Sequence, residues 1–119
     1  MTELFVYGTL KTGGSNHSHL SGQSCIGNVN TVPGYTLVGL TGYPGLVACE
    51  EDRAGVSGEL WLIDDACLVR LDLLEGTAEG LYRRAPIALA GKFASHAVET
   101  YHYLGSTTGR RRLGNLWVE

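Results

Sequence analysis

Short runs of alternating apolar and polar residues occupy most of the chain, and this pattern predicts β-strands. The clearest run, VSGELWLI, places Val56 and Leu60 on one face and Trp61 and Ile63 on the other. Glycine and proline turns separate it from similar runs, which lie at 4–7, 23–31, 35–40, 46–48, 81–89 and 97–104. The pattern is typical of a small sheet with turns about every ten residues.

The spacing of leucines predicts one main helix, from 66 to 74 or 75. Asp64 or Asp65 provides the N-cap, and Gly76 ends the helix. A second, short helix is expected at 17–20. Together these elements predict the α+β class, with a compact mixed or antiparallel β-barrel of about six strands, one main helix and one short helix.

Glu75 lies on the apolar side of the main helix. It follows Leu71 by four residues and Leu68 by seven, positions that share one helical face, whereas Asp65 and Asp72 mark the solvent-facing side. Burial and the helix C-terminus both disfavour a negative charge, so we expect a raised pKa for Glu75. Such a carboxyl is suited to general-base catalysis. If the helix ends one residue earlier, Glu75 instead points into water.

The strand at 4–7 ends in a glycine-rich loop that begins at Gly8. Glycines let backbone N–H groups approach a ligand, and Ser15 or Asn16 offers an N-cap for the short helix, so the loop favours an anionic group. The stretch also resembles the nucleotide-binding pattern G-x-x-x-x-G-K-[ST], but Gly14 replaces the phosphate-binding lysine, which argues against nucleotide hydrolysis. The alternative is a tight connection that binds nothing.

Length and composition indicate an ordinary globular protein. With 119 residues, 44% hydrophobic and 18% charged, the chain is expected to form one domain over 1–119. No apolar run approaches the ~20 residues that span a bilayer, and no signal-peptide pattern opens the chain, so we expect a cytoplasmic protein with no membrane partner. A net charge of −3 argues against nucleic acid as a partner. We interpret the basic stretch at 109–114 as a solvated turn.

The cysteines and histidines show no metal-site pattern. Cys25, Cys49 and Cys67 are widely spaced without a C-x-x-C pair, so we expect no disulfide framework and no zinc site, and we interpret all three as small buried apolar residues. The histidines lack companion carboxylates at metal-ligand spacing, so no metal site is expected.

A series of motifs runs along nearly the whole chain. They are FVYGTLKTGGSNH at 5–17, YPGLV at 43–47, VSGELWLID at 56–64, LDLLEG at 71–76, LYRR at 81–84 and the Y-x-Y of Tyr101 and Tyr103. In this order the motifs resemble those of the γ-glutamylcyclotransferase-like proteins, which include γ-glutamylamine cyclotransferases and similar small bacterial enzymes. The first and the fourth are the most specific.

The resemblance implies a barrel flanked by helices, with the site at one mouth and a small γ-glutamyl compound as substrate. It implies intramolecular attack of the substrate's α-amine on the γ-amide carbonyl, releasing 5-oxoproline and an amine without a cofactor. Glu75 corresponds to the general base and acid. The substrate-binding residues implied are Tyr7, Gly8, Thr9 and Leu10 of the YGTL turn, Asn16, which helps to hold the loop, and Tyr82 and Tyr101 as pocket residues. The spacer between Glu75 and Tyr82 varies in the family.

Two alternatives stay open at this point. One is a protein of the same fold that binds a small metabolite without turning it over. The other is a thiol hydrolase that uses Cys25 or Cys49 with a histidine, although neither cysteine lies at a turn-to-helix junction that would lower its pKa. The leaving amine is also open, and we expect the loops at 41–45 and 105–114 to select it.

Overall fold

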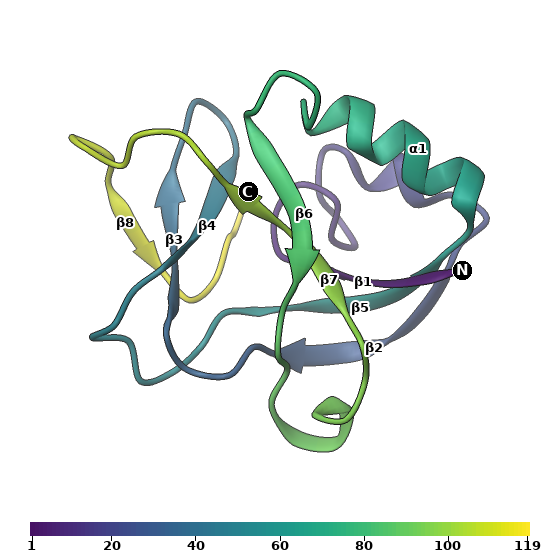
Figure 1. The fold of residues 1–119 in the computed structure, drawn as a ribbon, viewed down its shortest axis with the longest axis horizontal. Coiled ribbons are helices and arrows are strands. Elements are labelled where there is room, and N and C mark those ends of the chain that lie inside the picture. Colours follow the sequence, from purple (N-terminus) through teal and green to yellow (C-terminus); the bar gives the residue numbers. More distant parts are fainter.

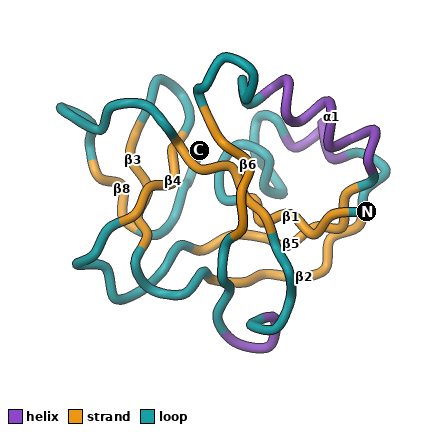
Figure 2. Tube along the Cα trace, viewed as in Figure 1, coloured by secondary structure: helices purple, strands orange, loops and turns teal.

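A curled mixed sheet forms most of the protein in the computed structural model, which describes residues 1–119 (Figure 1). The elements in chain order are β1 (Thr2–Val6), η1 (His17–Leu20), β2 (Ser24–Asn30), β3 (Tyr35–Gly39), β4 (Pro44–Ala48), β5 (Ser57–Ile63), α1 (Asp65–Leu74), β6 (Tyr82–Pro86), η2 (Gly91–Phe93), β7 (Glu99–Tyr103) and β8 (Arg112–Gly114). The α+β class and the single main helix are confirmed (Figure 2). The sheet has eight strands, more than expected, and η1 and η2 are both short 3-10 helices.

The sheet curls without closing. Its strand order is β2-β5-β1-β7-β4-β3-β8, and β6 pairs with β7 off this path. β7 runs parallel to β1 and to β4, and the other pairs are antiparallel. Because the end strands β2 and β8 do not pair with each other, the sheet is an open curl rather than a complete barrel. Figure 1 shows β3, β4 and β8 on one side and β1, β2 and β5 on the other.

The opening strand β1 is buried on both faces. Leu4 and Val6 belong to an apolar cluster that includes residues of α1, and Phe5 and Tyr7 belong to a second cluster on the other face. β5 alternates between the same two clusters, as its sequence pattern predicted. Strand alternation therefore produces two adjoining cores, with β1 between them.

α1 begins and ends at the predicted signals. The Asp64 side chain accepts a hydrogen bond from the Cys67 backbone N–H at 2.7 Å, so Asp64 is the N-cap. The helix ends at Leu74, Glu75 is the C-cap, and Gly76 follows at φ 66°, a conformation that favours glycine. With ten residues, α1 is not long or apolar enough to cross a membrane, and neither is any other helix.

The basic segment at 109–114 is not only a turn. Arg112–Gly114 forms β8 and pairs with β3, where Val38 faces Arg112 and Leu37 faces Gly114. The expectation was wrong because the segment has no alternation of its own. The strand forms because the outer edge of β3 offers backbone groups that need partners.

Two side-chain expectations were also wrong. Asn16 does not cap η1, because its amide donates instead to the Thr9 hydroxyl at 3.0 Å. Cys25 is exposed rather than buried, because it lies on the outer strand β2, whereas Cys49 and Cys67 are buried as expected.

Candidate active site

A cavity of about 270 Å³ lies between the loop after β1, the end of α1, and strands β6 and β7. Every site residue predicted from the sequence lines it: Tyr7, Gly8, Thr9, Leu10, Asn16, Glu75, Tyr82 and Tyr101. Residues separated by more than sixty positions in the chain therefore share one concave site.

Three consecutive backbone N–H groups, those of Gly8, Thr9 and Leu10, donate to no protein acceptor. Gly8 and Leu10 are nonetheless buried, and Thr9 is half-buried. Buried N–H groups normally have partners, so three free donors in a row beside a cavity form a site for an anion or a carboxylate.

The conformation of this loop is fixed from its inner side. Lys11 N–H donates to the Gly8 carbonyl at 3.1 Å, and Asn16 N–H donates to the Thr9 carbonyl at 2.9 Å. A Cβ atom added at Gly8 would lie only 2.8 Å from Cγ of Pro44, so a side chain there would push the loop away from β4. Glycine at this position lets the two walls of the cavity meet.

The C-terminal tail braces the same loop from outside. Lys11 Nζ donates to the Trp117 carbonyl at 2.8 Å, and Ser15 N–H donates to the Glu119 carboxylate at 3.0 Å. These polar contacts dock the C-terminal tail against the candidate binding loop.

Glu75 contributes the only carboxyl in the cavity lining. The side chain is half-buried and accepts no hydrogen bond from any protein group. Burial raises its pKa from 4.5 to about 7. Although the helix ends at Leu74, Glu75 keeps a helical backbone conformation, so its side chain stays on the cavity side rather than turning into water.

The three tyrosine hydroxyls around Glu75 are bound to protein acceptors. Tyr7 donates to the Tyr101 carbonyl at 2.6 Å, Tyr82 to the Pro44 carbonyl at 2.7 Å, and Tyr101 to Asp72 Oδ1 at 2.7 Å. Burial raises the pKa of each of these hydroxyls, so they remain protonated. Their rings form part of the cavity wall, and each hydroxyl donates its proton to a protein acceptor.

Asp72 does not mark a solvent face as expected. It forms an ion pair with Arg84 at 2.9 Å, and its side chain is only 26% exposed. The expectation was wrong because helical periodicity gives the direction of Asp72 but not the neighbours that the sheet brings to it.

Six further residues line the cavity that were not singled out as site residues from the sequence. They are Phe5, Val6, Tyr43, Pro44, Leu74 and Leu81. Of the two loops expected to select the leaving amine, 41–45 contributes Tyr43 and Pro44 to the cavity lining, whereas no residue of 105–114 reaches the cavity; selection of the amine stays a prediction. Each missed residue lies within a motif already identified, which is the signal that was available.

No cysteine lines the cavity, so neither Cys25 nor Cys49 is placed to act there, and partial desolvation of the exposed Cys25 raises the pKa of its thiol, which disfavours a thiolate nucleophile. No group of three or more histidine, cysteine, aspartate or glutamate side chains is placed to hold a metal ion. The chemistry available in the cavity is therefore that of one carboxyl, a row of peptide donors and an aromatic wall.

The family model and the relatives that match this chain all carry the name of gamma-glutamyl cyclotransferases. The family model described as gamma-glutamyl cyclotransferase, AIG2-like, matches residues 4–119. A putative gamma-glutamylcyclotransferase of Vibrio cholerae is 46% identical over 72 residues, which cover 60% of this chain and 60% of the relative's own length. The gamma-L-glutamyl-butirosin B gamma-glutamyl cyclotransferase of Niallia circulans is 30% identical over 108 residues, covering 87% of this chain and 67% of that protein.

Solved structures share the fold. The protein ytfP of Escherichia coli superimposes with a TM-score of 0.71 at 30% identity, over 98% of this chain and 95% of that one.

Proposed function

The chain belongs to the AIG2-like gamma-glutamyl cyclotransferase family, and from this premise we propose that it converts γ-glutamyl amides into 5-oxoproline and a free amine. The observation that carries the proposal is the pairing of Glu75, a carboxyl without a hydrogen-bond partner, with the free N–H groups of Gly8, Thr9 and Leu10 in one cavity. One group moves a proton, and the others hold an anion.

In this proposal the N–H groups of Gly8, Thr9 and Leu10 bind the α-carboxylate of the γ-glutamyl group. A carboxylate has the charge and the acceptor geometry that three adjacent peptide donors satisfy. Holding it orients the substrate so that its α-amine faces its own γ-carbonyl, and such positioning lowers the barrier by several kcal/mol.

Glu75 then acts as the general base and acid. The α-amine is an ammonium ion in water and has no lone pair, so Glu75 accepts a proton from it. The amine nitrogen attacks the γ-carbonyl, a new C–N bond closes the five-membered ring, and the C–N bond to the leaving amine breaks. Protons released by the attacking nitrogen pass to the leaving nitrogen, one of them through Glu75.

A pKa of about 7 suits both halves of this role. Near neutral pH the carboxyl is present in both protonation states, so it accepts a proton in one step and returns one in the next. Its freedom from protein hydrogen bonds leaves both oxygens available to the substrate.

The test is 5-oxoproline release over a panel of γ-glutamyl amines by the wild type and by Glu75→Gln. We expect the glutamine variant to fold normally and to lose about 10²–10⁴-fold in turnover, because an amide neither accepts nor returns the proton. Glu79→Gln is the matched control, since Glu79 is exposed and lies outside the cavity.

Retained turnover in Glu75→Gln would remove Glu75 from the base role. Binding of γ-glutamyl compounds by the wild type without any 5-oxoproline would instead support the metabolite-binding alternative.

A further inference from the structure

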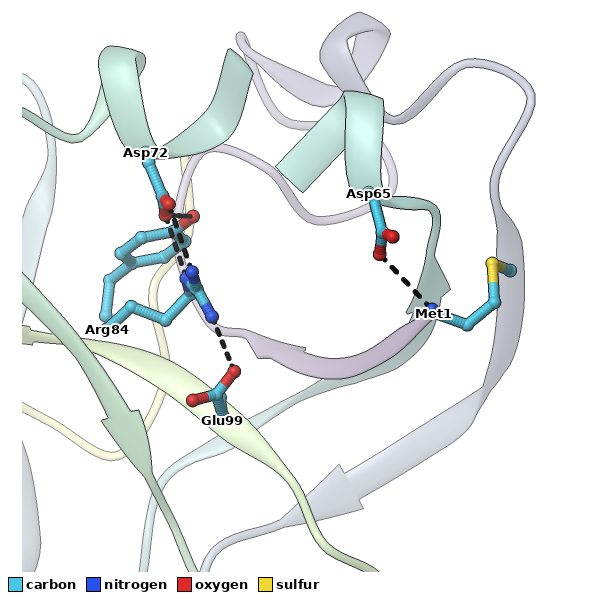
Figure 3. Close-up of polar contacts among 6 residues, drawn as sticks. Met1, Asp65, Asp72, Arg84 and Glu99 are labelled. Carbon is cyan, nitrogen blue, oxygen red and sulfur yellow. Dashed lines mark hydrogen bonds and ion pairs between the residues drawn. The ribbon is translucent and has the colours of Figure 1, made fainter. Parts of the chain in front are cut away.

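An ion-pair network joins α1 to two strands beside the cavity. Arg84 of β6 contacts Asp72 of α1 through Nε at 2.9 Å and Nη2 at 3.1 Å, and it contacts Glu99 of β7 through Nη1 at 2.6 Å (Figure 3). The three side chains are 26–33% exposed, so water screens them only in part. Because the guanidinium group of Arg84 is planar and rigid, its hydrogen bonds to two carboxylates fix the distance and the angle between α1 and the two strands.

The network also touches the cavity wall. The Tyr101 hydroxyl donates to the same Asp72 oxygen that Arg84 Nε contacts, and the Tyr101 ring lines the cavity. Burial alone would raise the pKa of Asp72, but hydrogen bonds from Arg84 and Tyr101 outweigh it and lower that pKa. Asp72 therefore stays ionised and holds both partners.

Glu75 follows Asp72 by three residues, at the end of α1. The buried side chains of α1 are Cys67, Leu68 and Leu71, whereas Leu73 and Leu74 are 73% and 40% exposed. Beyond Leu71 the helix end has little apolar anchorage. Asp72 provides the hydrogen-bonded side-chain attachment of this end to the sheet, through Arg84 and Tyr101.

We propose that Arg84 is a positioning residue for Glu75. By holding Asp72 against β6 and β7, it keeps the last turn of α1 over the cavity and the Glu75 carboxyl facing the N–H groups of the loop. This inference rests on the proposed function for its catalytic consequence.

The effect of Arg84 on Glu75 is mechanical rather than electrostatic. The other titratable side chains of the cavity lining are all tyrosines, and no lysine, arginine or histidine lines it; these tyrosines are Tyr7, Tyr43, Tyr82 and Tyr101. The raised pKa of Glu75 has burial as its cause. Loss of position would expose the carboxyl and lower its pKa, whereas loss of a nearby cation would raise the pKa, so the two effects differ in sign.

The experiment compares Arg84→Met with the wild type by the pH dependence of kcat/KM and by an NMR titration of the Glu75 side-chain carboxyl. We expect the titration midpoint and the acidic limb of the profile to move down by about 1 pH unit from a value near 7, as water reaches the carboxyl. We also expect kcat to fall about tenfold from misplacement of the base. A general loss of folded protein would lower the NMR signal and the kcat/KM value at every pH, but it would not move the titration midpoint of Glu75 or the pH of the acidic limb.

Asp65→Asn is the matched control. It breaks the other ion pair of α1, between the Met1 amino group and Asp65 at 3.3 Å, where the side chains are 56% and 90% exposed (Figure 3). Both pairs lie on one helix, but only the Asp72 pair adjoins Glu75, so the control should leave kcat and the titration midpoint unchanged.

Arg84→Lys is the second variant, because it keeps the positive charge and loses the forked guanidinium contact with two carboxylates. We expect the titration midpoint of Glu75 to move down by less than in Arg84→Met.

An unchanged or raised midpoint in Arg84→Met would overturn the proposal, and if that variant does not fold, an unchanged midpoint in Arg84→Lys would do so. The titration needs no turnover. A wild type that titrates near pH 7 but releases no 5-oxoproline would contradict the proposed function alone, and the titrations of the variants would still decide the role of Arg84.

Discussion

At the scale of single residues, Glu75 has the most unusual environment in the protein. It is a carboxyl placed among aromatic and apolar side chains without a hydrogen-bond donor to stabilise its charge. Asp64 and Asp52, by contrast, accept backbone N–H bonds that lower their pKa. A buried charge without a partner costs stability, and proteins keep such groups mainly where they serve a function.

This environment predicts how stability depends on pH. The folded pKa of Glu75 is raised from 4.5 to about 7, so the folded state binds its proton more tightly than the unfolded state does. The free energy of unfolding therefore falls as the pH rises from about 4.5 through about 7. The total loss is about 3 kcal/mol, because each unit of pKa shift corresponds to about 1.4 kcal/mol. The Glu75→Gln variant does not titrate at this position and so does not lose this stability. We expect urea unfolding between pH 4.5 and 8 to show that the free energy of unfolding of the variant rises relative to that of the wild type as the pH rises. A difference between the two that does not change with pH would contradict a buried carboxyl.

At the scale of elements, α1 has a polar cap in addition to its buried apolar side chains. Asp64 and Gln23 bind each other reciprocally: Gln23 Nε2 donates to the side-chain Oδ2 of Asp64 at 3.1 Å, and the backbone N–H of Asp64 donates to Gln23 Oε1 at 2.8 Å. This pair ties the start of α1 to the segment before β2. The two ends of the helix are thus held by polar contacts, Asp64 at one end and Asp72 at the other.

The cap predicts a specific pattern of stability changes. Asp64→Ala removes the acceptor of the Cys67 N–H and should lower the Tm by roughly 3–8 °C. Asp64→Asn keeps an acceptor oxygen and should cost less. Asp65→Ala is the control, because the Asp65 side chain is 90% exposed and accepts no helix N–H. Thermal unfolding followed by circular dichroism measures all three; equal effects of the Asp64 and Asp65 alanine variants would argue against the cap.

At the scale of the whole molecule, β7 joins the two sides of the sheet through two narrow seams, one with β1, where Leu4 pairs with Glu99, and one with β4. β4 and β7 share a single register pair, Leu46 with His102. Tyr7 crosses this seam: its hydroxyl donates to the Tyr101 carbonyl of β7 and accepts from the Leu46 N–H of β4 at 3.3 Å. The cavity lies beside this seam, so the residue that connects the two parts also forms a wall of the site.

Tyr7→Phe should therefore weaken the whole fold. The change removes two buried hydrogen bonds, one to the Tyr101 carbonyl and one from the Leu46 N–H, and we expect the free energy of unfolding to fall by about 1–3 kcal/mol. Tyr35→Phe is the matched control, because Tyr35 packs against the same core and its hydroxyl forms no hydrogen bond. Urea unfolding measures both variants; equal losses would mean that the hydroxyl bridge contributes nothing.

Local pattern predicted the features that depend on neighbours along the chain. Alternation predicted the two faces of β5, Asp64 and Gly76 predicted the ends of α1, and spacing from Leu68 and Leu71 predicted the apolar environment of Glu75. These features follow from backbone geometry, which repeats every two residues in a strand and every 3.6 in a helix.

The class of the fold, the main helix and the apolar side on which Glu75 lies follow from the order of residues along the chain. The pairing of β8 with β3, the contact of Asp72 with Arg84 and the acceptors of the tyrosine hydroxyls depend on how distant segments pack. The physical reason is that periodicity fixes the direction in which a side chain points, whereas its partner depends on which distant strand packing brings to that place.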